Sequence, residues 1–151
     1  MWYHYADKYT GAVIEFLCTE AIDTPWRIAE PIEYTDENHL VSTPKGWAKL
    51  MNMEKEIALK KLFDASVYTK SNDWSYENEW RIASFKGASE IGDYSDYLFD
   101  GRSIGNIYLG PLICQEAKKN LIGLSKKYPC IDVYQANIGV SRKIMFERIS
   151  R

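Results

Sequence analysis

Residues 104–135 read IGNIYLGPLICQEAKKNLIGLSKKYPCIDVYQ and contain two strand patterns on either side of one helix pattern. The first strand pattern, residues 104–109, is largely apolar and ends at a Gly-Pro turn signal. Between about residues 114 and 128, apolar side chains recur at steps of three and four, which predicts a helix with one apolar face. Residues 131–135 then predict another strand, because a proline ends the helix just before them.

Working outward from this stretch, the rest of the chain adds further strands and one long helix. Thr43-Pro44 is typical of a helix start, with Thr43 at the N-cap, and an apolar stripe predicts that this helix runs from about Lys45 to Ser66. The further predicted strands are residues 12–18, 31–34, 79–85 and 140–149, the last joined to 131–135 by a hairpin turn at 136–139. About six strands in a mostly antiparallel sheet with two main helices make an α+β fold.

Length and charge limit the classes of protein that the chain can belong to. Its 151 residues, 46% of them hydrophobic, suffice for one core, so we expect a single domain over residues 1–151. A formal net charge of −2 argues against a basic nucleic-acid binder. No run of apolar residues approaches the roughly 18 that a membrane span needs. We therefore predict neither nucleic acid nor membrane as a partner.

The cysteines indicate neither a disulfide framework nor a zinc site. Cys18, Cys114 and Cys130 are widely and irregularly spaced, and the chain has only two histidines, His4 and His39. Because each cysteine lies within or beside an apolar run, we expect buried, reduced thiols and no bound metal. The N-terminal residues also lack the pattern of a signal peptide, so we predict a cytoplasmic protein.

One short polar cluster carries groups that are suited to chemistry. If residues 77–82 form a strand, Glu77, Glu79 and Arg81 point to one side while Trp80 and Ile82 point to the core. A carboxylate held beside a guanidinium can accept a hydrogen bond from a ribose hydroxyl or stabilise a cationic centre. The spacing alone favours a simpler interpretation, a solvated strand face with an ion pair worth about 0–1 kcal/mol.

The N-terminal stretch Trp2-Tyr3-His4-Tyr5-Ala6-Asp7 is unusually aromatic for a chain end, where residues are normally polar and frayed. We therefore expect it to pack against the rest of the protein. His4 is a candidate hydrogen-bond donor to a ligand, although a core histidine bonded to a backbone carbonyl is the more common situation.

Motifs along the chain resemble those of a known family. Trp2-Tyr3-His4-Tyr5-Ala6-Asp7 with Gly11 resembles its Trp-x-His-Tyr-Ala-Asp…Gly signature, and Lys70 with residues 74–82 resembles its Lys-x3-Trp-x-Tyr-Glu-x-Glu-Trp-Arg centre. Further matches are Pro31–Tyr34, Ile104–Gly110 and Val133–Ala136. This is a large bacterial family of unknown function, common in phages, integrons, genomic islands and other mobile DNA.

The family's domain is similar to the ADP-ribosyltransferase-like fold, a split sheet that holds NAD in a cleft. That resemblance implies Glu79, with Glu77, as catalytic residues and NAD as the possible cofactor. It implies that the ligand-binding residues are His4, Tyr5, Trp74, Tyr76 and Arg81. Longer members carry an additional N-terminal part before the Trp-x-His-Tyr-Ala motif, so we expect this chain to hold an incomplete cleft.

Two functions are consistent with these patterns. The first is a mobile-element accessory protein that acts by protein–protein contact, with a homodimer as a candidate assembly, and keeps a degenerate nucleotide-binding cleft. The alternative is an enzyme that cleaves NAD or transfers ADP-ribose with Glu77, Glu79 and Arg81. The first is slightly favoured. For catalysis, the expected lack of the N-terminal part found in longer members weighs more than the presence of the Glu77, Glu79 and Arg81 motif.

Overall fold

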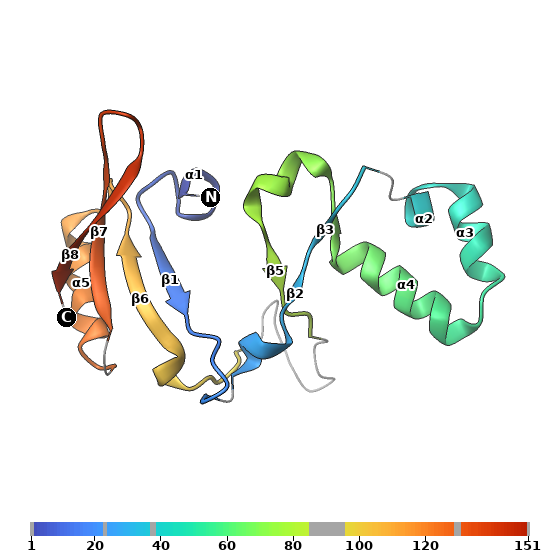
Figure 1. The fold of residues 1–151 in the computed structure, drawn as a ribbon, viewed down its shortest axis with the longest axis horizontal. Coiled ribbons are helices and arrows are strands. Elements are labelled where there is room, and N and C mark those ends of the chain that lie inside the picture. The colour runs from blue at the N-terminus through green and yellow to red at the C-terminus, as the bar shows by residue number, and fades with distance from the viewer. Residues whose placement is uncertain (1, 23, 37–38, 85–95, 129–130, 151) are drawn as a thin grey trace. The chain divides into compact units, whose positions relative to one another are not determined.

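A computed structural model describes residues 2–22, 24–36, 39–84, 96–128 and 131–150 (Figure 1). The chain divides into two compact units, each described by itself below. Unit 1 comprises residues 1–27 and 96–151, and unit 2 comprises residues 28–95. Helices and strands occur together in the chain, so the predicted α+β fold is confirmed. That residues 1–151 form a single domain stays a prediction.

Unit 1 is built on a four-stranded sheet with the order β1-β6-β7-β8 (Figure 1). The strands are β1 (Ala12–Phe16), β6 (Ile104–Leu109), β7 (Asp132–Ile138) and β8 (Ile144–Ser150). Strands β6 and β7 pair in parallel and the other pairs are antiparallel. A parallel pair needs a crossover connection, and the helix α5 (Gln115–Ser125) supplies it. The strand–helix–strand order predicted from residues 104–135 is therefore observed.

The core of unit 1 lies between this sheet and α5. Ile107 and Leu109 of β6 are buried with Ile131 and Val133, and Leu121 and Ile122 of α5 pack against them. The strands place alternate residues on opposite faces, so Asn106, Tyr108 and Tyr134 lie on the face away from α5. One face of the sheet is thus apolar core, and the other is aromatic and polar.

The N-terminal segment of unit 1 is fixed by a close backbone contact. It forms the short helix α1 (Trp2–Tyr5) and then a turn in which Asp7, Lys8 and Tyr9 have φ between 44° and 74°. A Cβ atom at Gly110 would lie 2.2 Å from the Tyr9 carbonyl oxygen, so only glycine fits there. The short 3-10 helix η3 (Gly101–Ser103) precedes β6, and another, η1 (Pro25–Ile28), spans the boundary between the two units in the sequence.

In its described residues, unit 2 combines two small sheets with three α-helices. In one sheet β2 (Glu30–Pro31) pairs with β5 (Trp80–Arg81), and in the other β3 (Glu33–Tyr34) pairs in parallel with β4 (Thr69–Lys70). The helices are α2 (His39–Ser42), α3 (Pro44–Met51) and α4 (Lys55–Val67), followed by the 3-10 helix η2 (Asn72–Glu77).

The single long helix predicted from Lys45 to Ser66 is wrong, because α3 ends at Met51 and α4 begins at Lys55. Asn52 caps α3, with its backbone N–H bonded to the carbonyls of the last turn, and its side-chain amide donates to the Ala48 carbonyl at 2.8 Å. Asparagine competes with the helix for backbone hydrogen bonds in this way. The predicted start is confirmed: the Thr43 hydroxyl accepts from the Gly46 N–H at 3.0 Å and Pro44 follows.

Several other predicted boundaries shift by a few residues. The strand predicted over 12–18 ends at Phe16, and the helix predicted over 114–128 spans Gln115–Ser125. The strand predicted over 79–85 is regular only at Trp80–Arg81, and residue 85 lies outside the described residues. The hairpin turn lies at 139–143 rather than 136–139, closed by a Gly139 N–H to Lys143 carbonyl bond of 2.9 Å.

The prediction of buried cysteines is wrong for the two that are described. Cys18 and Cys114 are free and exposed, and Cys130 lies outside the described residues. Cys18 follows the end of β1, and Cys114 is the N-cap of α5 rather than a member of its apolar face. Among the described residues, none of the helices is both long enough and apolar enough to cross a membrane.

Candidate functional site

The segment that carries the predicted carboxylates is not a continuous strand. Glu77 is the last residue of η2, and Asn78 follows in the left-handed conformation with φ of 51°. Only Trp80 and Arg81 belong to β5. Because a 3-10 helix and the left-handed Asn78 precede β5, the strand alternation assumed from the sequence does not apply at Glu77, and Trp80 is 65% exposed instead of buried in the core.

Lys70, at the end of β4, brings the two carboxylates together. Its Nζ forms an ion pair with the Glu77 carboxylate and lies 3.2 Å from Glu79 Oε2. The same ammonium lies 4.7 Å from the centre of the Trp74 ring, within cation–π range. The Glu77 side chain is only 3% exposed, so its charge is removed from water and the ion pair with Lys70 helps to compensate for that burial.

Arg81 fixes Glu79 from the other side. Its Nε donates to Glu79 Oε1 at 2.6 Å and its Nη2 to Oε2 at 3.1 Å, the forked geometry that guanidinium and carboxylate groups favour. Arg81 Nη1 also donates to the Val67 carbonyl at 2.6 Å, at the end of α4. The Glu79 N–H donates to the Tyr34 hydroxyl at 2.8 Å. Glu79 is therefore held by both its backbone and its side chain.

These contacts keep Glu79 ionised. The hydrogen bonds from Arg81 lower the pKa of Glu79 below its ordinary value, against the opposing effect of burial, and Lys70 lowers it further. We call Lys70, Glu77, Glu79 and Arg81 the Lys70 cluster. It holds two carboxylates and two cations, so its charges balance. The Glu79 side chain is 28% exposed and its two oxygens accept three of about four possible hydrogen bonds.

A polar cavity of about 360 Å³ adjoins the cluster through Lys70. Asp36 shapes one wall: its carboxylate accepts from the Ser71 hydroxyl at 3.0 Å and from the Asn72 side-chain amide at 2.8 Å. The bonds from Asn72 lower the pKa of Asp36, so it stays ionised. The lining residues are Thr35, Asp36, Ser42, Thr69, Lys70 and Ser71.

The remaining predicted ligand-binding residues lie at several places. Trp74 and Tyr76 are neighbours in η2 with ring centres 6.2 Å apart, and Tyr76 is 59% exposed. His4 and Tyr5 belong to α1 of unit 1, where both are exposed; the His4 ring lies edge-on to Tyr3 at 5.5 Å. The structure thus joins Glu77, Glu79 and Arg81 within unit 2, and Trp74 contacts their shared partner Lys70.

Lys70 is the member of the cluster that the sequence analysis did not name as a site residue. Its position four residues before Trp74, inside the motif that ends at Arg81, is the signal that would have found it. Spacing along one strand could not, because Lys70 lies on β4, which pairs with β3 rather than with β5.

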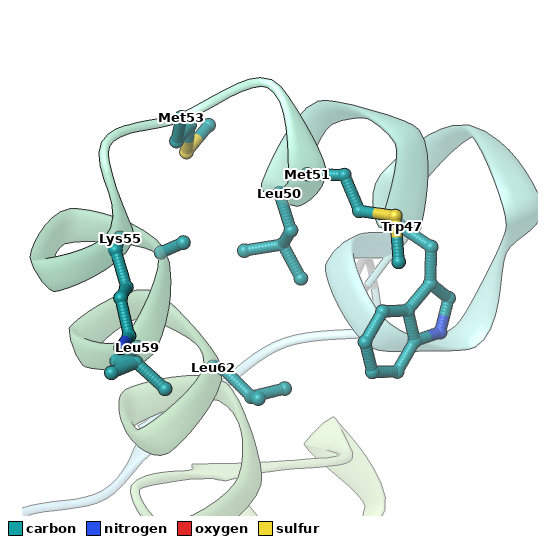
Figure 2. A pocket seen from close by; sticks show the side chains of 8 residues that line it. Trp47, Leu50, Met51, Met53, Lys55, Leu59 and Leu62 are labelled. Carbon is teal, nitrogen blue, oxygen red and sulfur yellow. The ribbon is translucent and has the colours of Figure 1, made fainter.

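Unit 2 also carries an apolar groove of about 310 Å³ between α3 and α4 (Figure 2). The apolar stripe predicted along one long helix is interrupted by the break at Asn52, and much of it lines this groove. Met51 is 82% exposed, Leu59 55% and Trp47 44%. The lining residues are Trp47, Leu50, Met51, Met53, Lys55, Ala58, Leu59 and Leu62.

Comparison with known proteins gives one family. The family described as "Protein of unknown function (DUF2971)" matches residues 1–82. The chain belongs to this family. No curated protein and no solved structure matches the chain.

The region that matches DUF2971 contains the N-terminal part of unit 1 and the main features of unit 2. Residues 1–82 include the Trp-x-His-Tyr-Ala stretch, the groove between α3 and α4, and the whole Lys70 cluster. The resemblance to a family of unknown function is thereby confirmed. Strands β6 to β8 of unit 1 lie beyond the matched residues.

Proposed function

We propose that this DUF2971 protein is a non-catalytic accessory protein that binds another protein through the groove between α3 and α4. The observation that carries the proposal is the groove itself, in which Trp47, Met51 and Leu59 remain 44–82% exposed (Figure 2). Clustered exposed apolar side chains are typical of interaction surfaces. An origin in mobile DNA and a cytoplasmic location rest on the sequence resemblance and the cysteine usage, and stay predictions.

The charge around the groove favours an acidic partner. Residues 44–67, which span α3 and α4, hold five lysines against three carboxylates, whereas the whole chain has a net charge of −2. Lys55 lines the groove directly. A groove between two helices suits an amphipathic helix that lays its apolar face into it. The partner that fits is therefore an amphipathic helix with acidic residues flanking its apolar face.

The Lys70 cluster supports a role without catalysis. Its carboxylates are matched by Lys70 and Arg81, so little negative charge is left to stabilise a cationic transition state. The cluster instead ties together the ends of β4, η2, β5 and α4. In this proposal the neighbouring polar cavity is a degenerate nucleotide-binding cleft.

A peptide titration tests the groove. The probe is a fluorescent amphipathic helix of about 18 residues, or five turns, with leucines on one face and glutamates elsewhere; its control carries lysines in place of the glutamates. Leu59→Gln removes a groove side chain, and Ile57→Gln is its matched control because Ile57 lies on the same helix, is 49% exposed and does not line the groove.

We expect the acidic peptide to bind, Leu59→Gln to weaken it about tenfold, and Ile57→Gln to change it less than twofold. Equal binding of both peptides, equal effects of both variants, or no binding at about 1 mM would contradict the proposal. Sedimentation velocity of the unliganded protein tests the predicted homodimer in parallel. A dimer that Leu59→Gln dissociates assigns the groove to a second copy rather than to an acidic helix.

The second candidate is an enzyme acting on the glycosidic bond of NAD. The observation that favours it is an ionised Glu79 that is 28% exposed and joined through Lys70 to a polar cavity. The test is NAD turnover and a thermal-shift titration with NAD, comparing wild type with Glu79→Gln. Turnover that is lost in Glu79→Gln would replace the binding proposal with this one; no turnover and no shift would remove it.

A further inference from the structure

The sheet face of unit 1 that lies away from α5 carries a connected group of aromatic rings. Tyr108 and Tyr134, paired in register on neighbouring strands, stack with ring centres 5.4 Å apart. The Phe146 ring of β8 lies edge-on to the Tyr108 ring, with ring centres 5.0 Å apart. The ring centres of Trp2 and Phe146 are 6.4 Å apart. Phe146 is 48% exposed, and the other three rings are half-buried. The π-electron density of these rings can attract a cation through cation–π interactions.

One carboxylate is fixed beside these rings. The Tyr108 hydroxyl donates to Glu15 Oε2 at 3.0 Å, and the Asn106 side-chain amide donates to the same oxygen. Burial, followed by the bond to Glu15, raises the pKa of Tyr108, so its phenol stays protonated and keeps donating. Glu15 Oε1 accepts no hydrogen bond from the described part of the chain, and Glu15 forms no ion pair there. Glu15 therefore offers one ready acceptor oxygen.

The backbone is arranged to aim this carboxylate. The pairing of β1 with β6 shifts between Ile14 and Phe16, a bulge that places Glu15 opposite two residues of β6. Bulges of this kind redirect a side chain and often occur beside functional sites. A Cβ at Gly105 would lie 3.2 Å from Glu15 Cγ and Cδ, so the glycine leaves the room that the Glu15 side chain occupies.

We propose that Trp2, Glu15, Asn106, Tyr108, Tyr134 and Phe146, here named the Glu15 site, bind an organic cation carrying a guanidinium or alkylammonium group. The free oxygen of Glu15 would accept a charge-assisted hydrogen bond from the cation, and the adjacent rings would supply cation–π attraction. Two charged groups of the neighbouring strands β7 and β8, Asp132 and Arg148, neutralise each other in an ion pair of 2.7 Å. Glu15 thus sets the sign of the charge that the site accepts.

The test is an NMR titration of the isotopically labelled protein with two cationic probes. Agmatine represents a free small cation, and acetyl-Gly-Arg-Gly-amide represents an arginine side chain of a protein. The control is the same tripeptide with citrulline, which has the shape of arginine without its charge. Glu15→Gln is compared with Glu147→Gln, because Glu147 is exposed and pairs with Gln135, whose side chain contacts Lys118 of α5 on the opposite face.

We expect the cationic probes to shift the Asn106 side-chain amide signals, and Glu15→Gln to weaken binding about tenfold. Glu147→Gln and citrulline test specificity: the variant should leave binding unchanged and the citrulline peptide should not bind. Tighter binding of agmatine indicates a free cation, and tighter binding of the peptide indicates a protein side chain. Equal binding of the citrulline peptide, equal effects of the two variants, or no shift with either cation would overturn the proposal.

A second variant keeps the test decisive if Glu15→Gln fails to fold. Gly105→Ala removes no charged group, but its Cβ would lie 3.0 Å from Leu17 Cδ2 and 3.2 Å from Glu15 Cγ and Cδ, so these side chains must move by a few tenths of an ångström. We expect it to weaken cation binding while the melting temperature stays close to wild type. Unchanged binding in a folded Gly105→Ala variant would show that the position of Glu15 does not matter, and would also overturn the proposal.

Discussion

Removing Lys70 should destabilise the protein far more than removing an ordinary surface lysine. In Lys70→Met, the Glu77 carboxylate, 3% exposed, loses its ion pair with Lys70, while Glu79 keeps both bonds from Arg81. Breaking a buried ion pair by removing one partner costs about 3–5 kcal/mol. Because Lys70 itself is 19% exposed, we expect the lower end, about 3 kcal/mol.

The assay is urea unfolding followed by tryptophan fluorescence. Lys61→Met is the control, since Lys61 is an exposed lysine on α4, and it should change the unfolding free energy by less than about 0.5 kcal/mol. Lys70→Met combined with Glu77→Gln also removes the buried charge that lost its ion pair with Lys70, and should recover a large part of the loss. The reasoning is refuted if Lys70→Met matches Lys61→Met, or if the double variant is no more stable than Lys70→Met alone.

Three further perturbations have expected outcomes. The folded pKa of Glu79 is lowered below the ordinary value of 4.5, so its stabilising effect is present above that pH and is lost as pH falls through the folded pKa. Acid unfolding curves should therefore differ in slope below about pH 4.5 between wild type and Glu79→Gln, and parallel curves would contradict this. Gly110→Ala should unfold unit 1, since its Cβ would clash with the Tyr9 carbonyl; near-native melting would contradict the contact. Cys18→Ser and Cys114→Ser should each remove one fast-reacting thiol in a titration with an aromatic disulfide, and an unchanged count would show that the thiol is covered.

The elements of unit 1 could be predicted because local pattern and tertiary environment agree there. The strand at 104–109 is apolar at the positions that face α5, and the turn signal after it coincides with the close approach at Gly110. The parallel pairing of β6 with β7 was not predicted from the pattern, which shows period and not direction.

The elements of unit 2 could be predicted less well because short-range hydrogen bonds override the periodicity. Helical spacing continues from Trp47 to Ala65, yet Asn52 caps α3 and starts a turn. Glu77 and Glu79 were correctly grouped with Arg81, but for the wrong reason: Lys70 joins them, not strand alternation. The contact between Lys70 of β4 and Glu77 of the 3-10 helix η2 produces no regular spacing of residues in the sequence. An argument from periodicity therefore could not predict it.

The pairing of β1 with β6 has a consequence for how the protein emerges from the ribosome. Ala12 pairs with Leu109, which is 97 positions later in the chain. At about 5–20 residues per second, the first strand waits about 5–19 s for its neighbour, while all of unit 2 is synthesised in between. During that interval β1 presents an unpaired apolar edge. We therefore expect the yield of folded protein to rise when a chaperone protects β1 of the nascent chain. Slow translation before residue 104 lengthens the wait and should lower that yield.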